Sequence, residues 1–173
     1  MLLQLRDKSA ASSARLAQAE EMVRLARSAG AQLIVNDRAD IARLSGADGV
    51  HVGQDDLSVD EARAIVGPHA IVGLSTHDEP QIAAAARTSA TYIAVGPIYG
   101  TTTKDTGYSA RGLDLVRRAA ATGRPVVAIG GITLERAPEV IAAGASSVAV
   151  ISDLLVGDDP EERVRRFLAR LAQ

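Results

Sequence analysis

The sequence contains no cysteine and no tryptophan, and only 2% of its 173 residues are aromatic. A chain without cysteine forms no disulfide bond and has no thiolate to serve as nucleophile or metal ligand, which fits a reducing, cytoplasmic environment. So few aromatic rings leave little surface for stacking against nucleic-acid bases. Disulfide scaffolds, cysteine enzymes and base-stacking proteins are therefore excluded or disfavoured.

Neither sign of charge dominates, because the net charge is −2 and acidic and basic residues are mixed along the chain. The sequence thus lacks a basic patch for nucleic acid or an anionic membrane. No apolar run is long enough to span a bilayer, and the first residues do not have the pattern of a signal peptide. With 47% hydrophobic residues the chain can bury a core, so we expect one cytoplasmic globular domain over residues 1–173.

Short apolar runs alternate with longer segments of helical period. The runs are rich in valine and isoleucine, too short for helices and apolar on both faces, which is typical of parallel strands covered by helices. We predict strands at Leu2–Leu5, Leu33–Val35, Gly49–Val52, Ile71–Leu74, Tyr92–Val95, Val126–Ile129 and Ser147–Ile151.

Helix signals fall between these runs. Ser58 with Glu61 forms a capping box, Asp159 before a proline marks a helix start, and Thr133 is the expected cap of a helix over Leu134–Ala143. Glycines followed by alanine and then by a strand indicate left-handed helix ends. These are Gly30, Gly46 and Gly144.

The repeated βα units predict an α/β fold, a TIM (β/α)8 barrel that is one βα unit short. The shortage lies at the front, because an apolar strand already begins at residue 2. We therefore expect a first strand and helix encoded upstream, or a partner segment that fills the gap and covers the strand edges. The competing fold is an open doubly wound sheet, which normally carries a glycine-rich fingerprint after its first strand, and this sequence has none.

The connection Val95–Gly107 combines glycines, a proline, threonines and Lys104. Small residues let backbone N–H groups approach an oxyanion, threonine hydroxyls donate to it, and lysine adds a compact positive charge. The composition indicates a phosphate or pyrophosphate cradle. A solvated, flexible surface loop is the alternative.

Charged residues follow the first three strands, where a barrel places its active site. Strand alternation puts Gln4, Arg6 and Lys8 on one side, as an anion site requires, although the two cations can also pair with acids at a helix start. Asp37 and Asp56 follow the next two strands and are suited to Mg²⁺, which takes one or two carboxylates together with water and phosphate oxygens. Ion pairing or helix capping is the alternative, and it is the interpretation we adopt for Asp40 and Asp55.

The later strands end in neutral residues. Ser75 offers a hydroxyl, and His69 and His77 are expected in loops. His51 alternates with Val50 and Val52, which allows it to point inward near the site, and a satisfied structural histidine is the alternative. Gly130–Gly131 and Ile151–Ser152 follow the last two strands, the position of the backbone phosphate site in many such barrels.

The motifs QLRDK, IVNDR, DGVHVGQDDL, VGLSTH, YIAVGPIYGTTTK, VVAIGGI and SVAVIS occur in the order and spacing of the thiamine-phosphate synthase family. The resemblance covers essentially the whole chain. It implies a Mg²⁺-dependent transferase that joins a pyrimidine pyrophosphate to a thiazole phosphate, releasing pyrophosphate. It also implies small phosphorylated molecules as partners and a homodimer.

The resemblance further implies roles for individual residues. Asp37 and Asp56 hold the metal, and Arg6, Lys104 and Ser75 are catalytic. The pyrimidine pyrophosphate is held by Gln4, Leu5, Arg6, Asp7, Lys8, Asn36, Ser75 and Lys104, and the thiazole phosphate by Thr101, Thr102, Thr103, Gly131, Ile151 and Ser152.

One residue departs from the family pattern, which commonly has proline where this chain has Gly100. We expect a less preorganised loop and the same reaction. Two alternatives stay open. A thiazole tautomerase has the same barrel fold but needs no pyrophosphate-binding site. A non-catalytic phospholigand-binding barrel is consistent with a shortened N-terminus.

Overall fold

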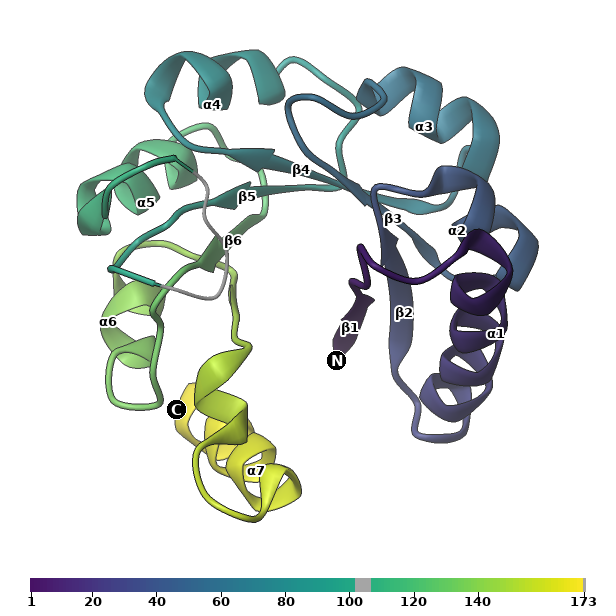
Figure 1. The fold of residues 1–173 in the computed structure, drawn as a ribbon. Helices are drawn as coiled ribbons and strands as arrows, with labels where there is room; N and C mark the ends of the chain where they lie inside the picture. Colours follow the sequence, from purple (N-terminus) through teal and green to yellow (C-terminus); the bar gives the residue numbers. More distant parts are fainter. Residues whose placement is uncertain (102–106, 173) are drawn as a thin grey trace. The chain divides into compact units, whose positions relative to one another are not determined.

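The computed structural model describes residues 1–101 and 107–172 (Figure 1). Its residues form two compact units. The first unit contains Met1–Ser75 and Thr88–Thr91, and the second contains Thr76–Arg87 and Tyr92–Gln173. The prediction of one domain over the whole chain stays a prediction. Within the described ranges, no helix combines the length and the apolar character needed to cross a membrane.

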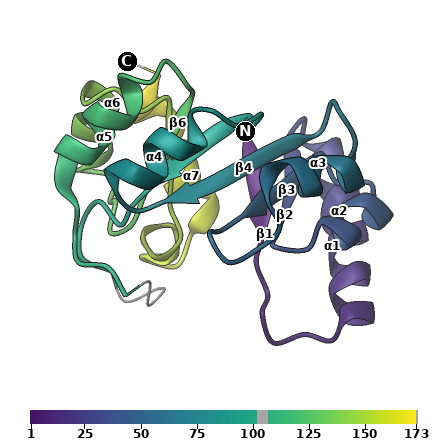
Figure 2. The ribbon, with the colours of Figure 1, turned by 90° about the horizontal axis from the view of Figure 1, so that it is seen from above.

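The first unit consists of parallel strands with helices along one face. β1 pairs with β2, β2 with β3 and β3 with β4, all in parallel. Figures 1 and 2 show the helices running beside these strands, and α1, α2 and α3 pack against β2 and β3. The elements in order are β1 (Leu2–Leu5), α1 (Ser12–Ser28), β2 (Gln32–Asn36), α2 (Ala39–Ser45), β3 (Gly49–Val52), α3 (Val59–Val66) and β4 (Ile71–Thr76), whose last residue belongs to the second unit.

The second unit repeats this arrangement. β5 pairs with β6 and β6 with β7, again in parallel, while α5 packs on β5 and β6 and α7 packs on α6 and on the 3₁₀ helix η1. The elements are α4 (Glu79–Ala85), β5 (Tyr92–Val95), α5 (Gly112–Ala120), β6 (Val126–Ile129), α6 (Ala137–Ala142), β7 (Ser147–Ala149), η1 (Ser152–Leu155) and α7 (Pro160–Leu171).

Each unit buries apolar strand residues that the sequence pattern marked, but Leu2 of β1 and Ile129 of β6 are exposed, so β1 is not covered on both faces as predicted. In the first unit Val35, Val50, Val52 and Val72 are fully buried, together with small alanines of the helices. In the second unit, the strand residues Ile93, Val95, Val126 and Ala128 are likewise fully buried. Burial of both faces explains why these strands lack polar alternation.

Local capping signals confirm the predicted starts of α3 and α7. The Ser58 hydroxyl accepts from the Glu61 N–H, and the Glu61 side chain accepts from the Ser58 N–H, so the capping box is complete. The Asp159 carboxylate accepts from the Glu162 N–H at the first turn of α7. Gly46 ends α2 in the left-handed region with φ 72°, as its place before a strand predicts.

β2 is longer than predicted by one residue at each end, and β4 continues to Thr76. Two other predicted boundaries also differ. The last strand ends at Ala149, and Ile151, with φ −125° and ψ −75°, has left the extended region and directly precedes η1. The helix expected from Leu134 begins only at Ala137. Thr133 accepts from the Arg136 N–H at 3.4 Å, and residues 134–136 form a turn in which the Leu134 N–H donates to the carboxylate of Asp153.

Replacing Ser58 with alanine should lower the free energy of unfolding by about 1 kcal/mol, because the Glu61 N–H loses its hydroxyl acceptor and the Glu61 carboxylate loses the bond from that hydroxyl. For a chain of this size the melting temperature should fall by roughly 2–4 °C. Thermal denaturation followed by circular dichroism measures the change. Ser13→Ala, at an exposed position inside α1, is the control and should not destabilise, and Ser58→Thr should restore most of the loss.

Candidate active site

The candidate residues of the first unit follow the carboxyl ends of its strands. The register aligns Leu5 with Val35, Asn36 with His51, and Val52 with Leu74. Parallel strands end at a common edge, so residues that follow them share that edge. Gln4, Arg6 and Lys8 are exposed and alternate with half-buried Leu3, Leu5 and Asp7, as predicted.

Lys8, Asp37 and Asp56 form a carboxylate cluster at this edge. The ammonium of Lys8 lies 3.0 Å from Asp37 Oδ2. The Asp37 carboxylate is near enough to Asp56 to raise its pKa, and Asp56 Oδ2 accepts from the Gly53 N–H at 2.7 Å. The structure thus brings together the two carboxylates that the sequence predicts as metal ligands. Among the described residues there is no group of three or more histidine or acidic side chains suited to a metal.

Asp37 has a left-handed backbone, with φ 63°, and is the sole non-glycine residue of positive φ among those that the structure describes. Its N–H donates to the His51 carbonyl of β3 at 2.8 Å, which holds the conformation in place. Aspartate tolerates this region better than most residues, but the conformation still carries a cost. Strain of this kind often accompanies a functional site.

The cluster disfavours a second negative charge. Burial raises the pKa of Asp56 above its usual value, and the neighbouring Asp37 carboxylate raises it further, whereas the Gly53 N–H and the Lys8 charge act in the opposite direction. Two carboxylates in contact repel one another when both are ionised, and a cation relieves that repulsion. The donor set is therefore suited to a divalent metal ion.

Ser75 is held by two neighbours from β3 and the turn after it. Its hydroxyl lies 2.7 Å from Nε2 of the buried His51, and its carbonyl accepts from the Gln54 side chain at 2.6 Å. Of the two interpretations of His51, this contact favours the one in which it points toward the candidate site, since it orients the Ser75 hydroxyl. Gln54 was missed, although it stands in the same HVGQDD motif.

Other acidic side chains near this edge have local partners. Asp7 Oδ1 accepts from the hydroxyl and N–H of Ser9 and from the Ala10 N–H, and these bonds lower the pKa of Asp7. Asp40 pairs with Arg38 at 2.6 Å, as its interpretation as an ion-pair residue predicts. Asp7 therefore shapes the turn after β1, and its predicted contact with substrate stays a prediction.

In the second unit, a tight backbone crossing surrounds Gly131. A Cβ atom on Gly131 would lie 2.4 Å from the Gly100 carbonyl oxygen, and one on Gly130 would lie 2.6 Å from Pro97. The Tyr99 N–H also donates to the Gly130 carbonyl at 2.9 Å. Glycine is required because the two chains touch here and because both glycines have positive φ.

The remaining phosphate candidates lie close in sequence to this crossing or at η1. Thr101 directly follows Gly100 and is half-buried. Ile151 is half exposed, and the exposed Ser152 is the first residue of η1. Thr102, Thr103 and Lys104 lie outside the described residues.

Two tyrosines lie within and directly after the connection Val95–Gly107, and their contacts were not predicted from the sequence. His77 stacks on Tyr108 at 4.5 Å, and Arg111 lies 4.8 Å from the same ring. Tyr99 donates to Glu139, and burial together with Glu139 raises the pKa of Tyr99 to about 12. The chain has three tyrosines, and two of them lie close together in the sequence. This spacing could have indicated aromatic contacts near this connection.

A protein-family model described as thiamine monophosphate synthase matches residues 1–154. The chain belongs to the thiamine monophosphate synthase family. The family predicted from the sequence motifs is thereby confirmed.

Named relatives agree with this family. The thiamine-phosphate synthase of Mycobacterium sp. (strain KMS) is 47% identical over 177 residues, covering 96% of this chain and 78% of the relative. That of Mycolicibacterium smegmatis is 48% identical, covering 99% of this chain and 80% of the relative. A solved structure, thiamine phosphate pyrophosphorylase from Pyrococcus furiosus, matches with a TM-score of 0.91 at 28% identity, over 99% of this chain and 82% of that one.

The structural match confirms the predicted α/β, TIM-like fold class of the thiamine monophosphate synthase family. The first βα unit expected upstream lies outside the described residues, and it stays a prediction. The roles assigned to single residues also remain predictions.

Proposed function

We propose that the chain is a thiamine-phosphate synthase. It joins 4-amino-2-methyl-5-hydroxymethylpyrimidine pyrophosphate to 4-methyl-5-(2-hydroxyethyl)thiazole phosphate, giving thiamine phosphate and pyrophosphate. Family membership supports this reaction. The observation that carries it is the carboxylate cluster, in which a strained Asp37 contacts both Asp56 and Lys8.

The first unit would bind the pyrimidine pyrophosphate. Lys8 and Arg6 supply positive charge for the diphosphate, and a lysine ammonium binds phosphate oxygens as a compact charge. Asn36 lies beside the cluster at the end of β2. Asp37 and Asp56 would hold Mg²⁺, which when bound neutralises charge on the leaving diphosphate.

Loss of pyrophosphate leaves a cationic pyrimidinylmethyl carbon that the 4-amino group stabilises by resonance. The thiazole nitrogen attacks this carbon with its own lone pair, so the chain needs to supply no nucleophile and no general base. Its task is to neutralise the departing diphosphate with Arg6, Lys8 and Lys104, and to orient the pyrimidine through Ser75, whose hydroxyl contacts His51.

The second unit would bind the thiazole phosphate. Gly131 follows β6, and Ile151 and Ser152 lead into η1. The close backbone crossing requires glycine at position 131, and a site built from backbone N–H groups needs such small residues. Threonines 101–103 would add hydroxyl donors. A homodimer and a cytoplasmic location complete the proposal, and both rest on the family resemblance and on composition.

Incubating the purified chain with both phosphorylated substrates and Mg²⁺, then oxidising the product to fluorescent thiochrome, tests the proposal. We expect thiochrome fluorescence that depends on all three components. Absence of product together with retained binding of thiazole phosphate would instead indicate a phospholigand-binding protein. Isomerisation of the carboxythiazole without condensation would indicate a tautomerase.

A further inference from the structure

A buried ion pair links three segments of the second unit. Asp153 Oδ2 accepts from Arg163 Nη2 at 2.7 Å and from Arg163 Nε at 3.2 Å. The same oxygen accepts from the N–H of Leu134 at 3.0 Å. The side chains of Asp153 and Arg163 are 10% and 12% exposed. One carboxylate oxygen therefore connects η1, α7 and the turn before α6.

Such a pair is not explained by stability alone. Two buried charges lose their hydration, and replacing a buried ion pair by apolar side chains of similar volume is often neutral or stabilising. The pair instead fixes the relative positions of the segments. The planar guanidinium of Arg163 donates through both Nε and Nη2 to the Asp153 carboxylate, which also accepts the Leu134 N–H. The Nε of Arg163 also donates to the Asp153 carbonyl at 3.2 Å, which holds the backbone of η1 directly.

The segments that it ties together are those proposed to hold the thiazole phosphate. Asp153 directly follows Ser152, and Leu134 lies three residues after Gly131. Arg136 reinforces the same turn by donating to the Gly131 carbonyl at 2.9 Å. A shift of η1 relative to this turn would therefore move Ser152 relative to Gly131.

We propose that Asp153 and Arg163 are positioning residues for the thiazole phosphate, although neither is placed in contact with it. The proposal rests on the proposed function of the glycine turn and η1. Arg163 fixes the Asp153 carboxylate, and the carboxylate fixes the distance between the two phosphate-binding segments. Backbone donors preorganised in this way bind an anion without reorganising, and small displacements weaken them strongly.

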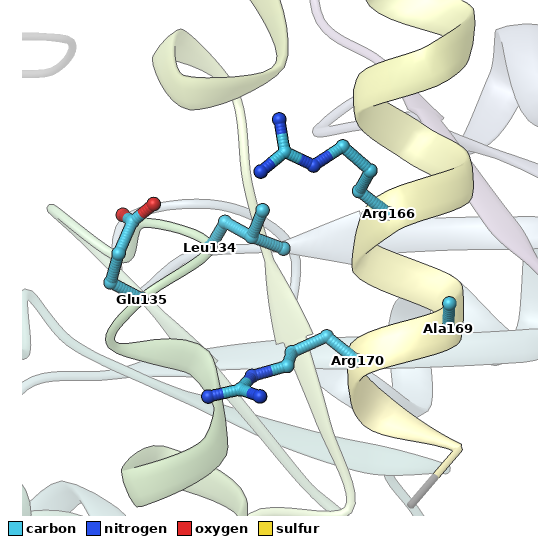
Figure 3. A pocket seen from close by; sticks show the side chains of 5 residues that line it. All are labelled: Leu134, Glu135, Arg166, Ala169 and Arg170. Atoms are coloured by element: carbon cyan, nitrogen blue, oxygen red, sulfur yellow. The ribbon is translucent and has the colours of Figure 1, made fainter.

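The outer side of this turn faces a pocket of about 430 Å³ rather than packed protein. Figure 3 shows Arg166 and Arg170 extending from α7 toward Leu134 and Glu135 across this pocket. Leu134 itself is buried, so the turn is held by packing of this side chain together with the bond from its N–H to Asp153. In the part of the chain that the structure describes, neither Arg166 nor Arg170 pairs with Asp153, so they supply matched controls on the same helix.

The test compares Arg163→Met with Arg166→Met in the complete chain. Arg163→Met should raise the KM for thiazole phosphate by about tenfold and leave the KM for the pyrimidine pyrophosphate within about twofold. Arg163→Lys, which keeps the charge but loses the fork, should lie between. Arg166→Met should change neither KM by more than about twofold. A KM does not depend on the fraction of folded protein, so partial unfolding does not imitate this result.

An unchanged KM for thiazole phosphate in folded Arg163→Met, or an equal rise in both KM values, would overturn the positioning role. If Arg163→Met yields no folded protein, the two KM values are measured for Asp153→Asn and Arg163→Lys instead. An unchanged KM for thiazole phosphate, or an equal rise in both KM values, would again overturn the positioning role. A wild-type chain that forms no thiamine phosphate contradicts the proposed function instead. In that case, calorimetric titration of the wild type and Arg163→Lys with thiazole phosphate still tests the positioning, and equal affinities would overturn it.

Discussion

Replacing Asp37 with asparagine is expected to reduce thiamine phosphate formation by about 10²–10³-fold. Asparagine keeps the shape of the side chain and tolerates the left-handed backbone at φ 63°. It removes the charge that faces Lys8 and Asp56. The change therefore isolates the electrostatic role of the carboxylate, and the thiochrome assay with saturating substrates measures it.

The same substitution should leave the melting temperature nearly unchanged. The Lys8 side chain is 59% exposed, so its ion pair with Asp37 is worth about 0–1 kcal/mol. In the folded state, the raised pKa of Asp56 means that its ionised form is disfavoured, which lowers stability at neutral pH. Removing the Asp37 charge lessens that penalty and offsets the lost pair.

Asp40→Asn is the matched control, because Asp40 lies three residues further on and pairs with Arg38 at 2.6 Å. Its turnover should stay within about threefold of wild type, as expected for a surface ion pair. If the turnover of Asp37→Asn were also within about threefold of wild type, the carboxylate cluster would no longer be a candidate metal site. The proposed binding of the diphosphate at this cluster would then be contradicted too.

Gly49→Ala should produce the largest loss of stability that the structure predicts. A Cβ at this position would lie 1.9 Å from the Ile71 carbonyl oxygen, which belongs to the paired residue of β4. The contact is with backbone, so no side-chain rotation relieves it. We expect a loss of about 4 kcal/mol or more and a fall in melting temperature of roughly 8–16 °C, or failure to fold.

Gly30→Ala separates this clash from the ordinary cost of replacing glycine. Gly30 has φ 65°, but nothing lies within 4 Å of an added Cβ. Its cost should be about 1–2 kcal/mol, the penalty of the left-handed backbone alone. Circular dichroism melts of both variants give the comparison, and a Gly49→Ala protein as stable as Gly30→Ala would show that β3 and β4 are not paired in this register.

Much of the fold was predictable because its signals are local. The apolar runs place β1, β3, β5 and β6 with the residues observed. The Ser58 box needs only a residue three positions away. The bond from the Leu134 N–H to Asp153 was not predictable in this way, because its acceptor lies 19 residues further along the chain.

Composition and spacing were enough to identify the parallel βα pattern, the polar residues after each strand and the family, because each depends on side chains close together in the chain. Four properties depend on the tertiary structure. They are the positive φ of Asp37, the raised pKa of Asp56, the hydrogen bond between His51 and Ser75, and the ion pair between Asp153 and Arg163. These properties arise where distant residues approach one another and lose water, so the pattern along the chain does not contain them.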